Sequence, residues 1–273
     1  MPDDALHDPS LIDRVVLVTG GSRGLGRAMA LALAQAGARV AINASRESPQ
    51  LGETLARAQA AGAASRTIAV LGDLRRADEC ERIVAEVNAR LGPVHVLVNN
   101  AAISMAGAGE PVWRADVEAW RRMVETNING VFHMMRAITP AMVAQGFGKI
   151  VNVSTGLGTM ARKLYAPYGP TKAFLEAASR AWAQELADVS VSVNVLLPGG
   201  AVDTAADVTG KPTPGRAFQP ASVMAAPILW LASDLSNGHT GERFVASRWD
   251  ESLPLTERVA AARQDGAKEP QIM

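Results

Sequence analysis

The sequence has little cysteine, few aromatic residues and no long apolar run. Its single cysteine, Cys80, excludes an internal disulfide and a cluster of cysteine metal ligands, and it fits a reducing compartment. A run of about 18 apolar residues is absent, and the first residues lack the basic and apolar regions of a secretory signal. We therefore expect a soluble, cytoplasmic protein without a metal site.

An excess of charge of either sign is also missing. Lys and Arg total 27, Asp and Glu total 27, and the formal net charge is zero. Without a long basic stripe, the sequence gives no indication of a nucleic-acid or membrane surface, and a small-molecule partner is favoured. The 273 residues can form one large domain, and neither a repeat nor a linker divides them.

The pattern of apolar runs predicts an α/β domain. Continuous β-branched runs, typical of strands buried on both faces of a parallel sheet, alternate with alanine-rich helical segments. We predict a doubly wound parallel sheet of about seven strands with helices on both faces. Residues 1–13 are predicted to be a flexible leader, 14–250 a single folded domain and 251–273 a C-terminal surface tail that can contain a short helix over 255–263.

A glycine-rich turn, Thr19 to Gly26, joins the first predicted strand to the first helix. A pyrophosphate must approach backbone N–H groups at a helix N-terminus, and a Cβ atom at Gly20, Gly24 or Gly26 would hold it off. The strand-turn-helix-strand context makes this turn more informative than a glycine motif alone. We interpret it as a nucleotide-binding turn, with tight helix packing as the alternative.

The end of the second predicted strand favours NADP(H) over NAD(H). An acidic residue there would hold the ribose 2′-hydroxyl of NAD, but the sequence has Asn43-Ala44-Ser45-Arg46. Arg46 and Ser45, together with Arg23 from the glycine turn, are suited to a 2′-phosphate. The alternative for Arg46 alone is a solvated loop arginine.

Further polar residues follow other strands or interrupt an apolar helix. Asp73 ends the third strand, where its carboxylate can accept the adenine amino group or cap the next helix. Asn99 and Asn100 end the fourth strand. Asn127 lies within an apolar helical segment, where a buried amide needs partners, and a purely structural role is its alternative.

Tyr168 and Lys172 are four residues apart at the start of a predicted helix, so they share one face. A neighbouring ammonium group favours the phenolate form of tyrosine, and such a pair can move a proton to or from a substrate oxygen. The alternative is an exposed helix face without chemistry. Because Pro170 lacks an N–H group, Pro167 or Tyr168 must be the first helical residue.

Together these motifs resemble the classical short-chain dehydrogenase/reductase family over about residues 15–245. The resemblance rests on the T-G-x-x-x-G-x-G turn, the N-N-A run, Asn127, the Y-x-x-x-K pair and the turn Pro198-Gly199. It implies a Rossmann-like sheet with NAD(P) in the crevice, and hydride transfer between nicotinamide and a ketone or secondary alcohol. It also implies a homotetramer or homodimer, with the helix of Tyr168 at a subunit interface.

The resemblance implies roles for individual residues. Tyr168 would be the acid/base, Lys172 would lower its pKa and hold the nicotinamide ribose, and Asn127 would position a water. Asp73 would lie by the adenine and Asn100 by the adenine ribose. The candidate catalytic residues are Asn127, Thr155, Tyr168 and Lys172. The candidate cofactor contacts are Gly20, Ser22, Arg23, Gly24, Leu25, Gly26, Ser45, Arg46, Asp73, Leu74, Asn100, Tyr168, Lys172, Pro198, Gly199 and Val202.

The sequence departs from the family pattern at three places. The serine expected thirteen residues before the tyrosine is Thr155, and we expect its hydroxyl to contact the substrate oxygen. Ser154 would point to the opposite face of a regular strand, but an irregular strand end would let it reach in instead. Ala102 replaces a glycine, and the glycine pair usual after the last strand is missing.

The favoured function is thus an NADP(H)-dependent oxidoreductase. A nucleotide-binding relative with weak or no turnover is the main alternative, supported by Thr155 and the altered tail. An isomerase or dehydratase that uses the same tyrosine has no feature of its own here. Residues 205–219 are predicted to be a mobile loop or lid. An apolar substrate is indicated by residues of the predicted pocket loops, namely Met105, Leu157, Met160, Leu164, Val202 and Val208.

Overall fold

A seven-stranded parallel sheet forms the centre of the computed structural model, which describes residues 8–104, 109–202 and 218–264. The strand order is β3-β2-β1-β4-β5-β6-β7. The strands are β1 (Val15–Thr19), β2 (Arg39–Ala44), β3 (Thr67–Leu71), β4 (Val96–Asn99), β5 (Gly148–Val153), β6 (Val191–Leu197) and β7 (Arg243–Val245). The predicted fold class is confirmed.

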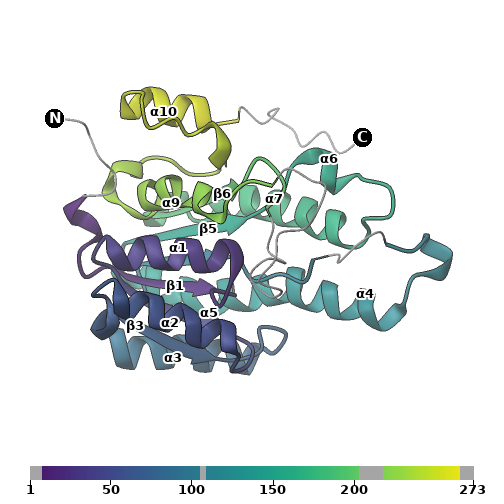
Figure 1. The fold of residues 1–273 in the computed structure, drawn as a ribbon, viewed down its shortest axis with the longest axis horizontal. Helices are drawn as coiled ribbons and strands as arrows, with labels where there is room; N and C mark the ends of the chain where they lie inside the picture. Colours follow the sequence, from purple (N-terminus) through teal and green to yellow (C-terminus); the bar gives the residue numbers. More distant parts are fainter. Residues whose placement is uncertain (1–7, 105–108, 203–217, 265–273) are drawn as a thin grey trace.

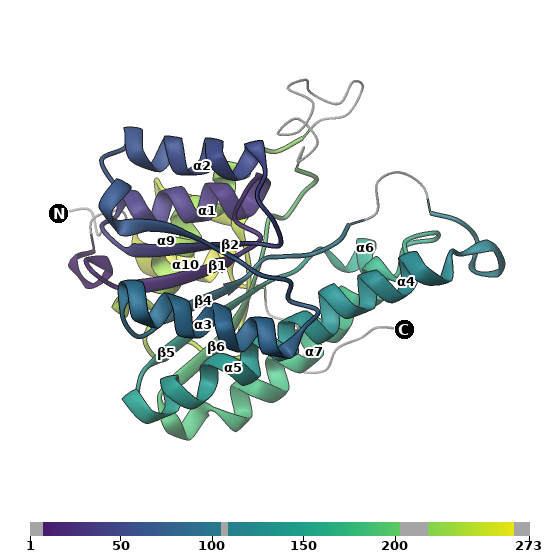
Figure 2. The same cartoon turned by 90° about the horizontal axis from the view of Figure 1, so that it is seen from below.

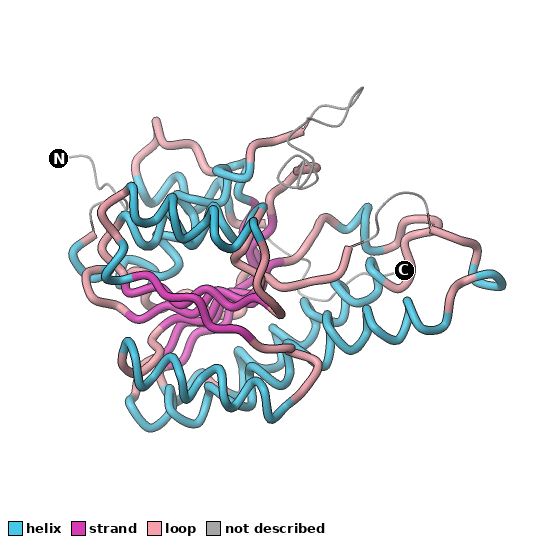
Figure 3. The backbone as a smooth tube through the Cα atoms, turned by 60° about the horizontal axis from the view of Figure 1, so that its bottom comes forward, coloured by secondary structure: helices cyan, strands magenta, loops and turns pink. Residues whose placement is uncertain are grey.

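Helices cover both faces of this sheet (Figures 2 and 3). They are α1 (Gly24–Gln35), α2 (Pro49–Ala60), α3 (Ala77–Leu91), α4 (Val117–Val124), α5 (Gly130–Gln145), α6 (Leu157–Met160), α7 (Tyr168–Glu185), α9 (Ala225–Ala232) and α10 (Leu255–Ala262). Figure 2 shows α1 and α2 on one side of the sheet and α3, α5 and α7 on the other.

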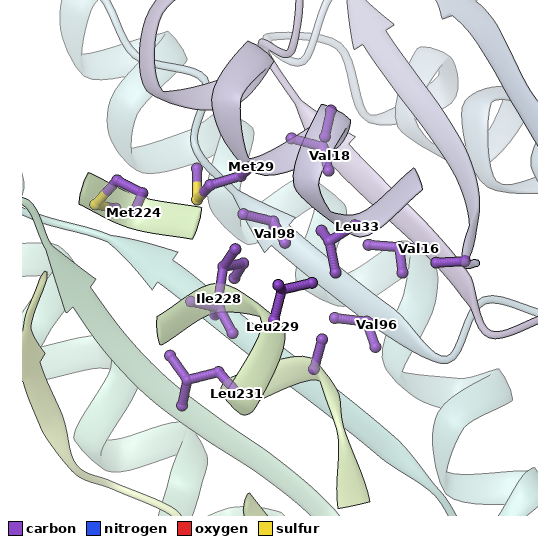
Figure 4. Close-up of a cluster of buried hydrophobic side chains, with 14 of the residues drawn as sticks. Val16, Val18, Met29, Leu33, Val96, Val98, Met224, Ile228, Leu229 and Leu231 are labelled. Carbon is purple, nitrogen blue, oxygen red and sulfur yellow. The ribbon is translucent and has the colours of Figure 1, made fainter. Parts of the chain in front are cut away.

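Alternate residues of a strand face opposite helical layers, which explains why most strand residues are apolar. Val16 and Val18 pack in the cluster that contains α1 and α9, whereas Val15 and Leu17 pack in the cluster that contains α3 and α5. Figure 4 shows Val16, Val18 and residues of α9 in the first cluster. Helix α9 is apolar on all sides, as expected for a helix that is buried completely.

Residues near both ends of the described chain pack in the core of the domain, within the segments predicted to be a leader and a tail. Leu11 is fully buried in the core, and Val259 and Ala262 of α10 pack in the same cluster. The burial of Leu11 was not visible in the short, largely polar segment around it, whereas a short helix over 255–263 was expected from the sequence and is present as α10. Residues 1–7 and 265–273 lie outside the described residues.

None of the described helices combines the length and the apolar character needed to cross a bilayer. Within the described ranges, no three His, Cys, Asp or Glu side chains come together as metal ligands.

Lys149 is a buried cation at the amino end of β5, far along the strand from the carboxyl ends. Its side chain is 3% exposed, and its Nζ donates to Ser236 Oγ at 2.9 Å. Burial, and to a lesser extent the charge of Arg14, lowers the pKa of Lys149 to about 8. Removal of this ammonium group from water therefore lowers the free energy of unfolding.

We expect Lys149→Met to raise the free energy of unfolding at pH 7 by about 1–3 kcal/mol. The unfolded lysine titrates near 10.5, so the unfolded chain binds more protons between about pH 8 and 10.5. Wild-type stability therefore rises with pH in that window, and the advantage of the variant shrinks there. Ser236 Oγ keeps carbonyl partners at Leu231 and Ser233.

Denaturant unfolding at pH 7 and at pH 10 measures this effect. The exposed Lys163→Met is the control, with an expected change within about 0.5 kcal/mol. If Lys149→Met is less stable than the wild type at pH 7, the contacts of the ammonium group fully offset its loss of hydration, and the prediction is wrong.

Candidate active site

One cavity of about 1310 Å³ opens at the carboxyl ends of the strands. The wall contains every predicted cofactor contact and three of the four predicted catalytic residues, Thr155, Tyr168 and Lys172. Asn127 is not part of the wall. The carboxyl ends of a doubly wound sheet are where ligands bind in this architecture, so the topology alone places the site here.

The glycine turn needs its glycines for close packing within the chain. Gly20 has a φ of +63°, and a Cβ there would lie 2.8 Å from Ala101 Cα. A Cβ on Gly26 would lie 2.4 Å from Gly20 O and from Asn100 Nδ2. Helix α1 begins at Gly24, so its first N–H groups lie at the cavity wall, where an anion is favoured.

Two side chains hold the turn in place. The buried Arg27 donates from Nη2 to Ser22 O at 3.0 Å and from Nε to Thr54 Oγ1 at 2.9 Å. Asn100 donates from Nδ2 to Thr19 O and to Gly20 O, both at 3.0 Å. The amide nitrogen of Asn100 is thus engaged with the turn, and the ribose contact that the resemblance implies stays a prediction.

The far end of the cavity carries the residues expected near a 2′-phosphate. Ser45, Arg46 and Arg23 are exposed and lie in the wall. Asp73 accepts from Arg75 N at 3.0 Å and from Arg75 Nε, and its hydrogen bond to the Arg75 side chain is the main cause that lowers the pKa of Asp73. This carboxylate therefore stays ionised, and Arg75 was not predicted from the sequence.

Positive charge is concentrated in this wall although the chain as a whole is neutral. Among the described residues, the wall has one acidic side chain, Asp73. Its basic side chains are Arg23, Arg46, Arg75, Arg122, Arg162, Lys172, Arg243 and Arg248. A cavity with this imbalance favours an anionic ligand.

At the other end of the cavity, Tyr168 is the first residue of α7 and Pro167 its N-cap, as predicted. Lys172 is 4% exposed, and its Nζ donates to Val153 O at 2.8 Å, at the end of β5. The helix start and the strand end thereby meet at the point where the two catalytic candidates lie.

Burial dominates the proton affinities of this pair. It raises the pKa of Tyr168, with a smaller effect of Tyr165 in the same direction. Burial also lowers the pKa of Lys172 to about 8, against the opposite effect of the Glu176 carboxylate. The direction for Tyr168 is opposite to the one expected from a neighbouring ammonium group, because removal of the phenolate from water is the largest effect on its pKa.

The two neighbouring hydroxyl groups after β5 differ in their surroundings. Ser154 is 4% exposed, and its Oγ is buried without a hydrogen-bond partner. Thr155 is half-buried in the cavity wall, and its carbonyl accepts from Arg243 Nη2 at 3.0 Å. Both residues line the cavity, and the greater exposure of Thr155 favours it over Ser154 as the hydroxyl that a ligand can reach.

Asn127 has a complete set of protein partners. It lies in a π-helical turn, Glu125–Asn129, between α4 and α5. Its Oδ1 accepts from Ile103 N at 2.8 Å, and its Nδ2 donates to Ile103 O at 3.0 Å and to Thr171 Oγ1 at 3.1 Å. The amide therefore joins the segment after β4 to the first turn of α7. These contacts favour the structural role, and the water-positioning role stays a prediction.

The wall beyond Tyr168 is more polar than the sequence indicated. Leu157 and Val202 lie in it, but Met160 is buried elsewhere and Leu164 is not part of it. Met105, Val208 and most of the predicted lid, 205–217, lie outside the described residues. Sequence reasoning did not single out Arg162, Tyr165 or Phe218 within the predicted pocket loops. The wall residues that it missed altogether include Arg75, Arg122, Thr126, Arg243, Arg248 and Gln264. Tyr165, three positions before Tyr168, could have been found from its spacing.

The chain is similar to known proteins in sequence and in fold. A family model described as short chain dehydrogenase matches residues 14–213. A 3-oxoacyl-(acyl-carrier-protein) reductase of Staphylococcus epidermidis is 31% identical over 239 residues, which cover 85% of this chain and 96% of that protein. The rhamnolipids biosynthesis 3-oxoacyl-(acyl-carrier-protein) reductase of Pseudomonas aeruginosa is 35% identical over 196 residues, covering 70% and 73%. A crystal structure of a short-chain type dehydrogenase/reductase from Mycobacterium marinum is similar with a TM-score of 0.76 at 28% identity, covering 89% of this chain and 96% of that one.

Proposed function

Because the chain belongs to the short-chain dehydrogenase family, we propose that it transfers a hydride between NADP(H) and a ketone or secondary alcohol. The observation that carries the proposal is one cavity whose wall contains the glycine turn, a cluster of basic side chains, and Thr155, Tyr168 and Lys172. The family is one of NAD(P)-dependent oxidoreductases, so the choice of NADP(H) and the roles of individual residues are the proposed part.

The residues present fit a phosphorylated dinucleotide. The turn leaves no room for a Cβ at Gly20 or Gly26, and the first turn of α1 lies beside it. We assign the 2′-phosphate to Arg46, Ser45 and Arg23, because charge-assisted hydrogen bonds to phosphate are strong. When bound, the nicotinamide supplies the hydride to a carbonyl carbon or accepts it from a carbinol carbon.

The chain's own residues move the proton. The Tyr168 hydroxyl donates a proton to the substrate oxygen in reduction and accepts it in oxidation. Because burial raises the pKa of Tyr168, the phenol is protonated at neutral pH, which suits the reductive direction. The Thr155 hydroxyl orients the same oxygen, and Lys172 holds the end of β5 and contacts the ribose.

For the substrate we propose 3-oxoacyl thioesters as the first class to test. The names of the relatives from Staphylococcus epidermidis and Pseudomonas aeruginosa describe reductases of such thioesters on a carrier protein. Arg122 and Arg162, which lie in the cavity wall, are suited to a substrate or carrier with negative charge.

The decisive experiment mixes the protein with NADPH and a panel of ketones and 3-oxoacyl thioesters and follows the nicotinamide absorbance. Secondary alcohols with NADP⁺ test the reverse direction. Turnover of a carbonyl compound supports the proposal. NADPH binding without turnover across the panel would instead support the nucleotide-binding alternative, and absence of both would remove the proposal.

We expect Arg46→Asp to weaken NADPH binding by about 10–100-fold and to leave NADH binding unchanged or improved. The substitution removes a cation from the 2′-phosphate and supplies the carboxylate that a ribose 2′-hydroxyl prefers. Fluorescence titration with both cofactors measures the two affinities. Arg57→Ala, on the exposed face of α2 and outside the cavity wall, is the control. A wild-type protein that prefers NADH would contradict the assignment of Arg46 and Arg23.

We also propose a cytoplasmic homotetramer or homodimer. Exposed apolar side chains on α4, α5 and α7 support an oligomer, namely Val117, Trp120, Phe132 and Phe174, which are 68%, 38%, 49% and 38% exposed. Burial raises the pKa of the Cys80 thiol to about 12, so this single cysteine is unreactive. Sedimentation that gives a monomer mass at micromolar concentration would contradict the oligomer.

A further inference from the structure

Arg243, the first residue of β7, connects three separate parts of the active-site wall. Its Nε donates to Glu176 Oε1 at 2.9 Å and Oε2 at 3.0 Å on α7, and its Nη2 donates to Thr155 O at 3.0 Å. Its Nη1 donates to Gln264 Oε1. All three guanidinium nitrogens are therefore engaged, in a cavity wall that also contains Tyr168.

The ion pair with Glu176 is shielded from water. The side chains of Arg243 and Glu176 are 15% and 22% exposed, less than most ion pairs of this protein. Glu176 lies one helical turn after Lys172 on α7. The planar guanidinium group can serve several acceptors in fixed directions, which a lysine at this position could not do.

Two cations thus join α7 to the segment that leaves β5. Lys172 donates to Val153 O at 2.8 Å, and Arg243, held on α7 by Glu176, donates to Thr155 O two residues later. Tyr168 is the first residue of the same helix. The separation between the Tyr168 and Thr155 hydroxyls therefore depends on both cations.

The C-terminal segment completes the arrangement. Gln264 N donates to Arg243 O at 2.8 Å, and Phe244 forms an antiparallel bridge with Arg263. Helix α10, which precedes Gln264, is anchored in the core by Val259 and Ala262 and lies beside α9 in Figure 1. Gln264 is thereby brought to the cavity wall from a position 96 residues after Tyr168 in the chain.

We propose that Arg243 is a positioning residue that sets the backbone of Thr155 against Tyr168, with Glu176 and Gln264 as its supports. The inference rests on the proposed function, since it concerns the geometry of the proton transfer. It assigns the C-terminal segment a part in the active site. A reacting geometry that shifts by about 1 Å can cost about 100-fold in rate, so the effect is expected in kcat.

The test compares four variants in the carbonyl-reduction assay, with cofactor affinity and thermal unfolding measured in parallel. Arg243→Met removes all hydrogen bonds of the side chain. Arg243→Lys keeps the positive charge that pairs with Glu176 but lacks the planar guanidinium group that donates to several acceptors. Gln264→Leu removes only the acceptor from the C-terminal segment. Arg14→Met is the matched control, because its ion pair with Asp234 also has one well-buried partner but lies at the amino ends of the strands.

We expect Arg243→Met to lower kcat about 100-fold, with NADPH affinity unchanged. Arg243→Lys should recover part of this loss, and Gln264→Leu should show a smaller loss than either. Arg14→Met should lower the unfolding temperature and leave kcat unchanged. Because Gln264→Leu preserves the ion pair, it keeps the test informative if Arg243→Met does not fold.

Two results overturn the inference and can be told apart. If the wild type reduces a carbonyl compound and the Arg243 and Gln264 variants keep its kcat while their unfolding temperatures fall, the pair stabilises the fold only. If the wild type turns over no compound of the panel, the proposed function fails and the inference fails with it.

Discussion

Replacement of Tyr168 by phenylalanine is expected to lower kcat by about 10²–10⁴-fold, the range that general acid–base catalysis contributes. The substitution removes only the hydroxyl that donates the proton, and the ring stays in its place at the start of α7. NADPH affinity should change little, since the glycine turn and the basic residues are untouched. Steady-state kinetics and a fluorescence titration of NADPH measure the two quantities.

Tyr165→Phe provides the matched comparison, because the chain has two tyrosines and both lie in the same cavity wall. Tyr165 contributes to the raised pKa of Tyr168, and its ring packs against the Arg162 guanidinium group at 4.6 Å. We expect this variant to lose less than about tenfold in kcat. A larger loss at Tyr165 than at Tyr168 would show that the acid/base has been assigned to the wrong tyrosine.

The second large effect is expected from Gly26→Ala, which should weaken NADPH binding by more than about 100-fold. The added Cβ would lie 2.4 Å from Gly20 O, a contact that backbone atoms can relieve only if the turn moves. Overpacking of this kind also costs about 1–3 kcal/mol of stability. Titration with NADPH and denaturant unfolding measure the two effects.

Gly52→Ala is the control for this prediction. Gly52 lies within α2, and a Cβ there meets no atom within 4 Å. The substitution should raise stability by about 0.4–1 kcal/mol through the unfolded chain and leave NADPH binding as in the wild type. Wild-type affinity in Gly26→Ala would show that the turn does not bind the cofactor.

The central part of the fold could be predicted because each relevant signal is local. Val15 to Val18 form a continuous apolar run, and the glycine turn follows at once, so strand, turn and helix were visible within about thirty residues. Pro170 likewise limited the start of α7 to two positions, and the structure begins the helix at Tyr168. Local steric rules were sufficient for both.

The features that escaped prediction depend on contacts between distant segments. Leu11 joins the core although its apolar neighbour Ile12 is exposed, and Arg243 reaches Thr155 across 88 positions of the sequence. Nothing in the residues around Arg243 or Gln264 marks them as part of the site. Burial at the start of α7 raises the pKa of Tyr168. The four-residue spacing from Lys172 gives no information on this burial, so the direction of the shift could not be predicted from the sequence.

The bridge between Phe244 and Arg263 also affects how the molecule meets other chains. β7 is the last strand of the sheet, and a terminal strand exposes backbone groups that can pair with a strand of another molecule. Gln264 N already donates to Arg243 O, so the chain's own C-terminal segment occupies part of this edge. The segment that supports Arg243 thereby also protects the sheet against intermolecular strand pairing, and its loss would favour aggregation as well as inactivation.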